Sequence, residues 1–590
     1  MNAANPVSRV SCVVLALTVV VGLLHLGHRI RRVQVDEAAD YDYASLRQSV
    51  RRVQVGGTRG RILDRDGRVL AANRQSLSVV CHPAVFQRRT WDETVTNIAR
   101  AVVRAADVIG RPSRLTEKDI RRHVNQELAM PLVAWRDIGE DELARFSEQA
   151  SSLPGFSLRE SEERTYPNGS LAAHLLGSVG RDRGDAVAGD EKYNFFSPEL
   201  RGRAGLEHYY DSFLRGVSGE RRLLVDARGF AIREWTVIEP IAGPDLHLTL
   251  DLEIQREAER QLAGTKGACV VLDPRNGDVL ALASAPGFDP NEFVPVLSHE
   301  RYEQLAKDLR KPLLNRACGG SYAPGSTFKP VVALAALSAG VPANLMYNCN
   351  GLFELGPMRL RCASRWGHGR LDLQHALMKS CNPYFCNLGL DVGTNALVSA
   401  ARAFGLGAKT GLDYGVDAAG VVPTAEWKMR TYGERWFMGD VAQMSIGQGM
   451  LLVSPLQMAL VAGAIGTGFR VTPHLKRGIV SACEPLPFAP EHLAVVREGM
   501  RLVVAGEDGV RGTGWRGGEG LPVAVSGKTG TAEVGRGATR RKNTWFIAYA
   551  PSERPTVAVA LVVENGDSGG GTAAPRVGAI LKRIFGEGES

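Results

Sequence analysis

The sequence lacks internal repeats, long low-complexity tracts and any compact basic block with interleaved aromatic residues. Nucleic acid is therefore not expected as a partner. The 71 basic and 63 acidic side chains leave a formal charge of +8, which is mild over 590 residues and compatible with an anionic lipid surface. Hydrophobic residues make up 44% and charged residues 23%, so wholesale disorder and a multi-pass membrane protein are both excluded.

One domain is too few for a chain of this length, because single domains typically have about 150 residues. The sequence therefore predicts two or three domains. Cysteines are few, nine in all, yet five of them fall between residues 318 and 386. This group lacks the C-x2-C spacing that makes zinc sites easy to recognise from sequence.

A nineteen-residue stretch near the N-terminus, between Arg9 and Arg29, contains no Asp, Glu, Lys or Arg. As a helix it would span about 28 Å, close to the hydrocarbon thickness of a bilayer. A cleaved signal peptide is the alternative, but no small-residue cleavage site follows the run. We expect an uncleaved single membrane anchor. Its orientation is less clear. Only Arg9 precedes the run, whereas Arg29, Arg31 and Arg32 follow it. Because basic residues tend to stay on the cytoplasmic side, this count would place the C-terminal bulk in the cytoplasm.

The remaining sequence divides near Pro244, where short strands and glycine-rich turns give way to a strand followed by an amphipathic helix. Before it, residues 59–73 predict two short strands around an Asp-Gly turn, and residues 87–165 are mainly helical in pattern. We predict a cytoplasmic tail over residues 1–9 and a transmembrane helix over residues 10–28. An elongated spacer without catalytic residues follows over 29–244, and one large domain over 245–590.

The large domain shows strands at both ends and helices between them. Residues 268–284 read as two strands joined at Asn276-Gly277, and residues 544–564 contain a second pair of β-branched and aromatic strands. About 240 residues between the pairs are largely helical. This pattern predicts one sheet covered by helices, and hence a mixed α/β (α+β) fold.

The segment SYAPGSTFKPVVALAALSAG contains a possible nucleophile. A turn at Pro324-Gly325 precedes an apolar helical run, so Ser326 is predicted at a helix start, with Lys329 one turn later on the same face. A serine hydroxyl needs a base to become nucleophilic, and a lysine with a lowered pKa can serve. Alone, Ser-x-x-Lys equally describes a helix-capping serine with a solvated lysine.

Two further segments favour the catalytic interpretation. MKSCNPYF places Ser380 and Asn382 on either side of Cys381, in a turn after a helix. VAVSGKTGTAEV predicts a strand in which a glycine would let a ligand lie close. Lys528 would be a second cation that keeps Lys329 neutral, Ser380 would relay a proton, and Asn382 would hold a peptide amide. The strand contributes the residues Lys528, Thr529, Gly530 and Thr531.

The three motifs together are those of penicillin-binding proteins and serine β-lactamases. The chain resembles a class B penicillin-binding protein along nearly its whole length, through RGRILDRDGRVLA, ERTYPNGSLAAHLLGSVG, GRAGLEHYYDSFLRGVSG and SIGQGMLLVSPLQMA. FDPNEF, WGHGRLD and VPTAEWK resemble the elongation type, penicillin-binding protein 2, more than the division type. The resemblance implies a membrane helix, an elongated pedestal and a transpeptidase domain whose antiparallel sheet is flanked by helices.

The resemblance also implies a reaction. Ser326 would attack the D-Ala-D-Ala bond of a peptidoglycan stem peptide, with Lys329 as base, and an amine of a neighbouring strand would take the acyl group. The backbone N–H groups of Ser326 and Thr531 would form the oxyanion hole. β-Lactams would acylate Ser326, and no cofactor is needed for catalysis. Because this substrate is extracytoplasmic, we expect the large domain outside the bacterial cytoplasmic membrane, against the charge count.

The expected partners are a membrane glycosyltransferase of the SEDS class and rod-complex scaffold proteins. Two other functions remain open. A carboxypeptidase or β-lactamase would use water instead of the acceptor amine, but the anchor and the pedestal argue against it. A scaffold that activates its polymerase partner would need no active site, and the complete motif set argues against that.

The clustered cysteines suggest a metal site. Cys349, Cys362, His368 and Cys381 have the spacing C-x12-C-x5-H-x12-C and would complete a Cys3His set that suits zinc. Some elongation-type relatives are similar, with carboxylates, a histidine and a cysteine holding zinc in this loop. Disulfides and free buried cysteines are the alternatives, and Cys386 is near enough to replace one ligand. We predict one structural zinc ion beside the active site.

Overall fold

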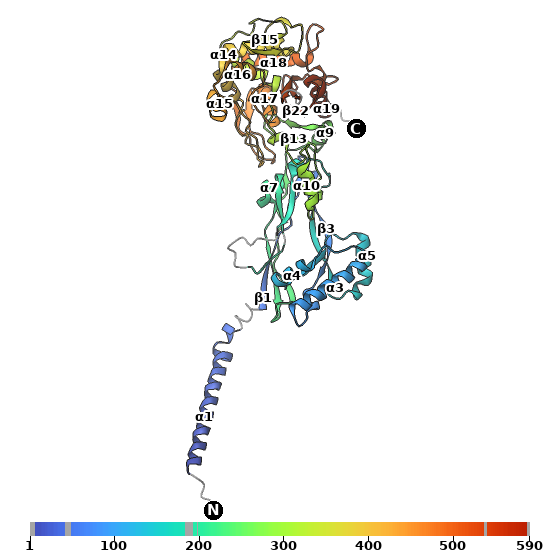
Figure 1. The fold of residues 1–590 in the computed structure, drawn as a ribbon, viewed down its shortest axis with the longest axis vertical. Coiled ribbons are helices and arrows are strands. Elements are labelled where there is room, and N and C mark those ends of the chain that lie inside the picture. Colours follow the sequence, from blue (N-terminus) through green and yellow to red (C-terminus); the bar gives the residue numbers. More distant parts are fainter. Residues whose placement is uncertain (1–5, 42–48, 183–192, 198, 536–539, 587–590) are drawn as a thin grey trace, which may run out of the picture.

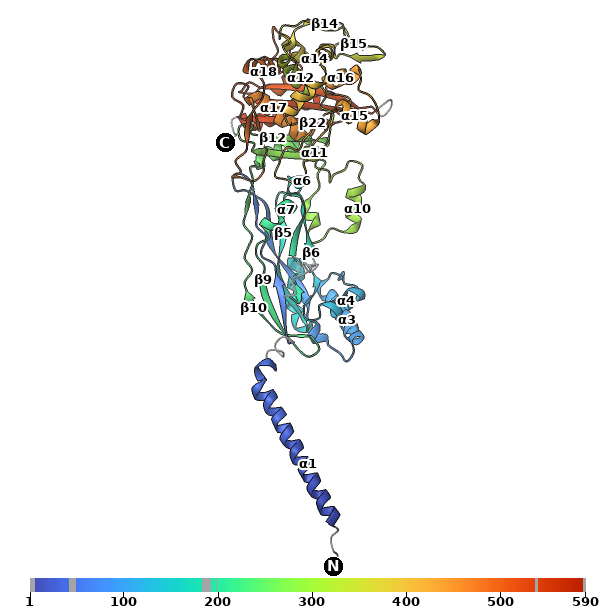
Figure 2. The same cartoon turned by 90° about the vertical axis from the view of Figure 1, so that its left-hand side faces the viewer.

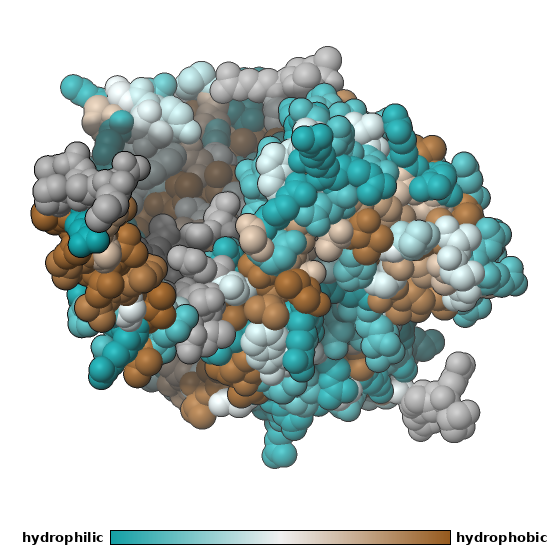
Figure 3. Space-filling model, turned by 90° about the horizontal axis from the view of Figure 1, so that it is seen from below, coloured by the Kyte–Doolittle hydropathy of each residue, from teal (hydrophilic) through white to brown (hydrophobic). Residues whose placement is uncertain are grey.

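The computed structural model describes residues 6–41, 49–182, 193–197, 199–535 and 540–586. The chain is elongated, with a helix, a narrow middle part and a globular C-terminal part following one another along the long axis (Figures 1 and 2). Helix α1 (Pro6–Arg31) contains the predicted apolar run, and none of the run is buried inside the protein. From below, apolar side chains gather along this helix (Figure 3). It fits a single-pass membrane anchor. Residues 1–5 of the predicted cytoplasmic tail lie outside the described residues.

Besides the two-stranded pair of β6 (Ser178–Asp182) and β8 (Glu199–Ala204), two larger sheets form the pedestal. The first has the order β10-β9-β1-β7, and the second has the order β11-β2-β3-β4 with β5 also paired to β3. The predicted turn near residue 66 is present, with Gly67 at φ +84° between β2 and β3. The strands are β1 (Val50–Val55), β2 (Ile62–Leu63), β3 (Val69–Cys81), β4 (Leu132–Trp135), β5 (Phe156–Thr165), β7 (Phe195–Phe196), β9 (Gly219–Val225), β10 (Ala231–Ile238) and β11 (Leu246–His247).

Residues 87–165 are less helical than their pattern predicts. Three helices cover one side of the second sheet, but β4 and β5 also come from this stretch. β5 pairs with β3 over ten residues although its sequence is rich in charged side chains. Glu160 and Glu162 of this strand are exposed, whereas Glu163 and Arg164 are buried in ion pairs. Neither face therefore shows a hydrophobic pattern that would reveal the strand. The helices are α3 (Trp91–Ile109), α4 (Glu117–Gln126) and α5 (Glu140–Gln149).

A buried charge cluster ties distant parts of the pedestal together. Glu207 accepts hydrogen bonds from Arg59 Nε at 2.6 Å and from Arg164 Nε at 2.7 Å. All three side chains are at most 2% exposed. Removing one member of such a set leaves a buried charge without its partner, which typically costs about 3–5 kcal/mol. Nearby elements are α6 (Ala173–Leu176), β6 (Ser178–Asp182), β8 (Glu199–Ala204), α7 (Gly205–Tyr209) and α8 (Asp211–Leu214).

A five-stranded sheet of order β13-β12-β22-β21-β20 forms the centre of the C-terminal domain. All neighbouring strands are antiparallel, and both predicted hairpins are present. The N-terminal hairpin therefore joins the C-terminal one through β12 and β22, as the predicted single sheet requires. The strands are β12 (Lys266–Leu272), β13 (Val279–Ala285), β20 (Ser526–Val534), β21 (Arg541–Ala550) and β22 (Val557–Glu564).

Helices cover both faces of this sheet. One core contains side chains of α9 and α19, and the larger core on the other face contains those of α12, α14 and α17. The helices are α9 (Leu252–Leu262), α10 (His299–Lys307), α11 (Arg316–Gly319), α12 (Lys329–Ser338), α13 (Leu373–Met378), α14 (Asn382–Ala403), α15 (Ala425–Tyr432), α16 (Met438–Ser445), α17 (Pro455–Thr467), α18 (Pro490–Ala505) and α19 (Ala574–Phe585).

Small two-stranded sheets extend from the helical part. β14 pairs with β17, β15 with β16, and β18 with β19. The first two pairs lie at the end of the molecule that is farthest from α1 (Figures 1 and 2). Their bounds are β14 (Tyr347–Cys349), β15 (Leu352–Leu355), β16 (Met358–Arg361), β17 (Gly369–Leu371), β18 (Phe469–Val471) and β19 (Cys483–Pro485).

Candidate active site

The turn that carries Ser326 is a short 3-10 segment, Gly325–Phe328, and α12 begins only at Lys329. Ser326 thus lies in the 3-10 turn, three residues before the α-helix begins, and it is half-buried. Gly325 has φ +55°, and a Cβ there would lie 3.0 Å from the Thr531 carbonyl oxygen. The turn therefore packs directly against the backbone of β20, which places Ser326 beside the strand that carries the third motif.

Lys329 lies at the meeting point of the first two motifs. Its Nζ is 2.8 Å from the Ser380 carbonyl oxygen, 3.4 Å from Ser380 Oγ and 2.7 Å from Asn382 Oδ1. The side chain is fully buried, and among the residues that the structure describes it has no ion pair with a carboxylate. Among the described residues, no hydrogen bond joins Lys329 to the Ser326 hydroxyl. The lysine is one turn from the serine, as predicted, and its own contacts are to the second motif.

The second motif occupies a strained turn between two helices. α13 ends at Met378, Ser380 has φ +54°, and α14 begins at Asn382. A left-handed conformation is unfavourable for a residue with a side chain, so the surrounding contacts must hold it. Asn382 Nδ2 donates to the Arg361 carbonyl oxygen at 2.9 Å, which fixes the amide. The predicted turn after a helix is confirmed.

The third motif lies in β20, as predicted. Lys528 is fully buried, and its Nζ donates to Ser380 Oγ at 2.8 Å, so it joins the second motif to the third. A Cβ at Gly530 would lie 2.8 Å from Thr327 Cγ2 and 3.0 Å from the Pro324 carbonyl oxygen. The sequence suggested that a ligand would lie close against this glycine. In the structure, the turn that carries Ser326 (Gly325–Phe328, the nucleophile turn) and the preceding Pro324 make the close approach.

Burial controls the protonation of both lysines. It lowers the pKa of Lys329 to about 8, although the nearby cysteine thiols oppose the change. Burial, reinforced by the charge of Lys329, lowers the pKa of Lys528 well below its ordinary value. We expected Lys528 to help keep Lys329 neutral, and because the repulsion between two ammonium groups is mutual, that effect stays a prediction beside the effect of burial. Burial by itself is enough to make Lys329 a candidate base near neutral pH.

Two supporting groups were missed in the sequence. The backbone carbonyl of Arg361 holds Asn382, and the Thr513 hydroxyl lies 2.9 Å from Thr529 Oγ1. A backbone carbonyl leaves no trace in residue type. Thr513 belongs to a Gly-rich loop, RGTGWRGG, whose turn-forming composition is the only signal it offers. Arranged in this way, the site can activate a hydroxyl, relay a proton and hold a peptide amide.

The predicted zinc ligands come together beside this site. One ligand atom from each of Cys349, Cys362, His368 and Cys381 lies within 4.8 Å of all the others. His368 Nδ1 is 3.7 Å from Cys349 Sγ and 3.5 Å from Cys362 Sγ, and the sulfurs of Cys362 and Cys381 are 4.0 Å apart. The site is built from β14, the end of β16, the loop before β17 and the cap of α14.

These distances are close to the edges of a tetrahedron around a metal. With metal–sulfur bonds of about 2.3 Å and metal–nitrogen bonds of about 2.0 Å, neighbouring ligand atoms are roughly 3.5–3.8 Å apart. Hydrogen bonds from Cys381 and His368 lower the pKa of Cys362, which favours the thiolate that a metal needs. Cys386 lies outside the cluster, with its Sγ 3.6 Å from the Ala442 carbonyl oxygen.

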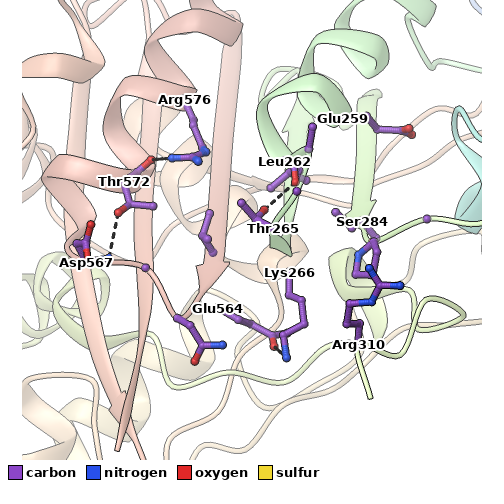
Figure 4. Close-up of a pocket in the computed structure, with 18 of the residues that line it drawn as sticks. Glu259, Leu262, Thr265, Lys266, Ser284, Arg310, Glu564, Asp567, Thr572 and Arg576 are labelled. Carbon is purple, nitrogen blue, oxygen red and sulfur yellow. Dashed lines mark hydrogen bonds and ion pairs between the residues drawn. The ribbon is translucent and has the colours of Figure 1, made fainter. Parts of the chain in front are cut away.

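A cavity of about 810 Å³ lies at another part of the domain, at the end of the central sheet. Charged side chains from several elements line it, including Glu259, Lys266, Arg310 and Arg576 (Figure 4). Burial raises the pKa of Glu259 to about 7. The lining includes none of the candidate active-site residues, so the cavity does not identify the site.

Known proteins share this architecture. Residues 267–584 match the penicillin binding protein transpeptidase domain, and residues 54–248 match the penicillin-binding protein dimerisation domain. The peptidoglycan D,D-transpeptidase MrdA of Escherichia coli K12 is 33% identical, over 94% of this chain and 89% of its own length. MrdA of Acinetobacter baumannii is 32% identical, over 94% of this chain and 84% of its own length.

A solved structure agrees with these sequence matches. The complex between penicillin-binding protein PBP2 and MreC from Helicobacter pylori aligns with a TM-score of 0.77 at 27% identity. The alignment covers 91% of this chain and 98% of that chain. The likeness therefore extends over the pedestal and the C-terminal domain together.

Proposed function

This chain belongs to the penicillin-binding proteins with a transpeptidase domain, as an elongation-type class B member and a peptidoglycan D,D-transpeptidase, and on that premise we propose that Ser326 is its nucleophile and Lys329 its general base. One observation carries the proposal: Lys329 is fully buried, one turn from Ser326, and contacts Ser380 and Asn382. The comparisons do not favour the division-type or hydrolase alternatives.

The first half of the reaction is the acylation of Ser326. Neutral Lys329 takes the hydroxyl proton, and the oxygen attacks the carbonyl carbon between the two D-alanines of a stem peptide. The N–H groups of Ser326 and Thr531 stabilise the oxyanion. When the carbon–nitrogen bond breaks, a proton passes through Ser380 to the leaving amine, and free D-alanine departs.

The second half transfers the acyl group. An amine of a neighbouring stem peptide attacks the ester, loses a proton to the same relay and releases Ser326. Asn382 holds the donor amide. Lys528 and the hydroxyls of Thr529 and Thr531 hold the terminal carboxylate, while Gly530 keeps the strand against the nucleophile turn. β-Lactams stop the reaction because they present a similar amide, and the resulting ester persists on Ser326.

Intact-mass analysis after exposure to a labelled penicillin tests these assignments. One adduct per chain is expected, located by peptide mapping on Ser326. The Ser326→Ala protein should carry none while keeping the melting temperature of the parent. An adduct on another residue, or persistent labelling of the alanine variant, would refute the nucleophile.

The cysteine–histidine cluster is proposed to hold one structural zinc ion through Cys349, Cys362, His368 and Cys381. The close approach of the four ligand atoms and the lowered pKa of Cys362 support it. Bound zinc would supply a fixed cross-link and no chemistry. Because Cys381 lies between Ser380 and Asn382, the cross-link would hold the second motif to the loop of His368. Elemental analysis of protein purified without a metal-affinity tag should give about one zinc per chain.

The location of the catalytic domain follows from its substrate. We place the bulk of the chain on the extracytoplasmic side, because stem peptides are cross-linked there, despite Arg29, Arg31 and Arg32. Protease added to intact spheroplasts should digest the region after residue 40. Protection until lysis would show that the positive charges determine the orientation.

The proposed protein partners are a SEDS-class glycosyltransferase and rod-complex scaffold proteins. The structure of a relative in complex with MreC supports a scaffold partner of that kind. The pedestal, which lies between membrane helix and catalytic domain, is the part best placed to meet them (Figure 1). Co-purification of both classes with the full-length chain, and its loss when the pedestal is exchanged, would test this.

A further inference from the structure

Four large apolar side chains are exposed within ten residues of the catalytic domain. Met429, Tyr432, Phe437 and Met438 are 47%, 58%, 61% and 59% exposed. Within the described part of this domain, no other ten-residue stretch exposes as many. Contiguous exposed apolar surface in a soluble domain commonly marks a binding site. We call these four side chains the aromatic ridge.

The ridge is held in a fixed shape. Met429 and Tyr432 are three residues apart on α15 and so share one face. Lys428, which is buried beneath them, has its Nζ 2.9 Å from Asp440 Oδ2 and 5.2 Å from the centre of the Phe437 ring. This cation contact fixes Phe437 on the surface. The ridge therefore needs little reorganisation before a ligand binds.

Contacts connect the ridge to the active site from two directions. A Cβ at Gly439 would lie 2.7 Å from Met358 Cε, and Met358 begins β16, whose last residue holds Asn382. α16 begins at Met438 and ends at Ser445, and shortly beyond it Gly447 accepts a hydrogen bond from the Gly325 N–H at 2.8 Å. Eight helical residues rise about 12 Å. The Met438 end of the ridge is thus roughly 10–15 Å from the nucleophile turn, on the side of Asn382.

That separation matches the length of the donor. An extended stem peptide of five residues spans about 17 Å. With its terminal D-alanines between Ser326 and β20, and its amide on Asn382, its other end reaches the ridge. In peptidoglycan the sugar chain is attached at that end. The helices α15 and α16 lie in the C-terminal domain, which the pedestal separates from α1, so a lipid surface is not the partner of the ridge (Figures 1 and 2).

Resting on the transpeptidase function above, we propose that the aromatic ridge is a subsite for the glycan chain of the donor strand. The flat faces of Tyr432 and Phe437 suit the apolar faces of sugar rings. Exposed polar side chains around them, on Arg430, Glu434 and Arg435, can bond to hydroxyl and acetamide groups. The subsite would align the polymer so that successive stem peptides reach Ser326.

The test compares a ridge variant with a matched control in the full-length protein. Tyr432→Ala/Phe437→Ala removes both rings, and Phe469→Ala removes a 44% exposed ring elsewhere in the domain. Three substrates are used: a labelled penicillin, a soluble pentapeptide, and uncross-linked glycan strands bearing pentapeptides. We expect the ridge variant to raise KM for the strands roughly tenfold with little change in kcat. Its penicillin and pentapeptide kinetics, and all kinetics of the control, should match wild type.

Binding of peptide-free glycan strands gives a second readout. Wild type and Phe469→Ala should bind these strands equally, and the ridge variant roughly tenfold more weakly. Equal binding of the strands by all three proteins overturns the proposal. An equal rise in the KM of the ridge variant for the soluble pentapeptide and for the glycan strands also overturns it. If the ridge variant differs from wild type only in self-association, the ridge is a protein-contact surface, and the glycan proposal is overturned. If penicillin does not label Ser326 in wild type, the catalytic assignment fails instead.

Discussion

Lys528 Nζ donates a hydrogen bond of 2.8 Å to Ser380 Oγ, and this contact joins the second and third motifs. Within the described part of the chain neither side chain bonds to a carboxylate, so buried amines orient the hydroxyl. The same hydroxyl lies 3.4 Å from Lys329. Ser380 is therefore the group through which a proton can pass between the two lysines and a leaving amine.

The Lys528→Ala variant should lose acylation by roughly 100-fold or more, because the proton relay loses the group that orients it. Its melting temperature shows whether the variant is folded, because removing a fully buried side chain also leaves a cavity. Stopped-flow acylation with a fluorescent penicillin measures the rate. A change below threefold would separate Lys528 from the relay.

The acylation rate should rise with pH through about 8. Burial lowers the pKa of Lys329 to about that value, and only the neutral amine can accept the Ser326 proton. Below pH 7 most lysine is protonated and the rate falls about tenfold per pH unit. Second-order rate constants between pH 6 and 10 check this. A profile that is flat from pH 6 to 9 would exclude Lys329 as the base.

The Cys362→Ser variant should lose zinc, melt at a lower temperature and acylate Ser326 more slowly, because Cys381 would no longer be fixed beside Ser380. Cys386→Ala is the matched control, since Cys386 contacts the Ala442 carbonyl and lies outside the cluster. It should retain one zinc per chain. Elemental analysis and differential scanning fluorimetry give the answer, and equal zinc in both variants would disprove the ligand set.

Glu259 should make stability depend on pH. Burial raises its folded pKa from 4.5 to about 7, so its contribution is fully present below pH 4.5 and is lost as pH rises through 7. Glu259→Gln keeps the acceptor for the Ala172 N–H and removes the charge. Unfolding at pH 8 should cost up to about 3 kcal/mol more in the variant than in wild type, with no difference at pH 4.5. Parallel stability curves would contradict this.

Local pattern was enough to predict the hairpins and the three motifs. Asn276-Gly277 marks its turn by residue type, and SxxK, SxN and KTG are spaced residues on regular elements. The contacts that decide protonation are not local. Lys329 meets Ser380 and Asn382 across about fifty residues, and its burial depends on the whole domain. The strand β5 was missed because its partner β3, not its composition, makes it a strand.

The glycine of the third motif shows the same limit. Its presence in a strand indicated a close approach, but the sequence could not say which atoms approach. Thr327 and Pro324 occupy that space, and they come from a segment two hundred residues earlier. The metal cluster was predictable as a set of residue types, whereas the exclusion of Cys386 depends on the face of α14 that it occupies.

The pairing of β12 with β22 has a consequence for biosynthesis. The first hairpin of the central sheet is complete at residue 285, yet its neighbour in the sheet begins at residue 557. During synthesis the first hairpin must wait for almost three hundred residues before its exposed edge is covered, a long-range closure that is slow to form. The chain therefore cannot react with substrate or antibiotic until its final strands have emerged. A nascent chain truncated before β22 would leave the edge of β12 unpaired and would have no activity.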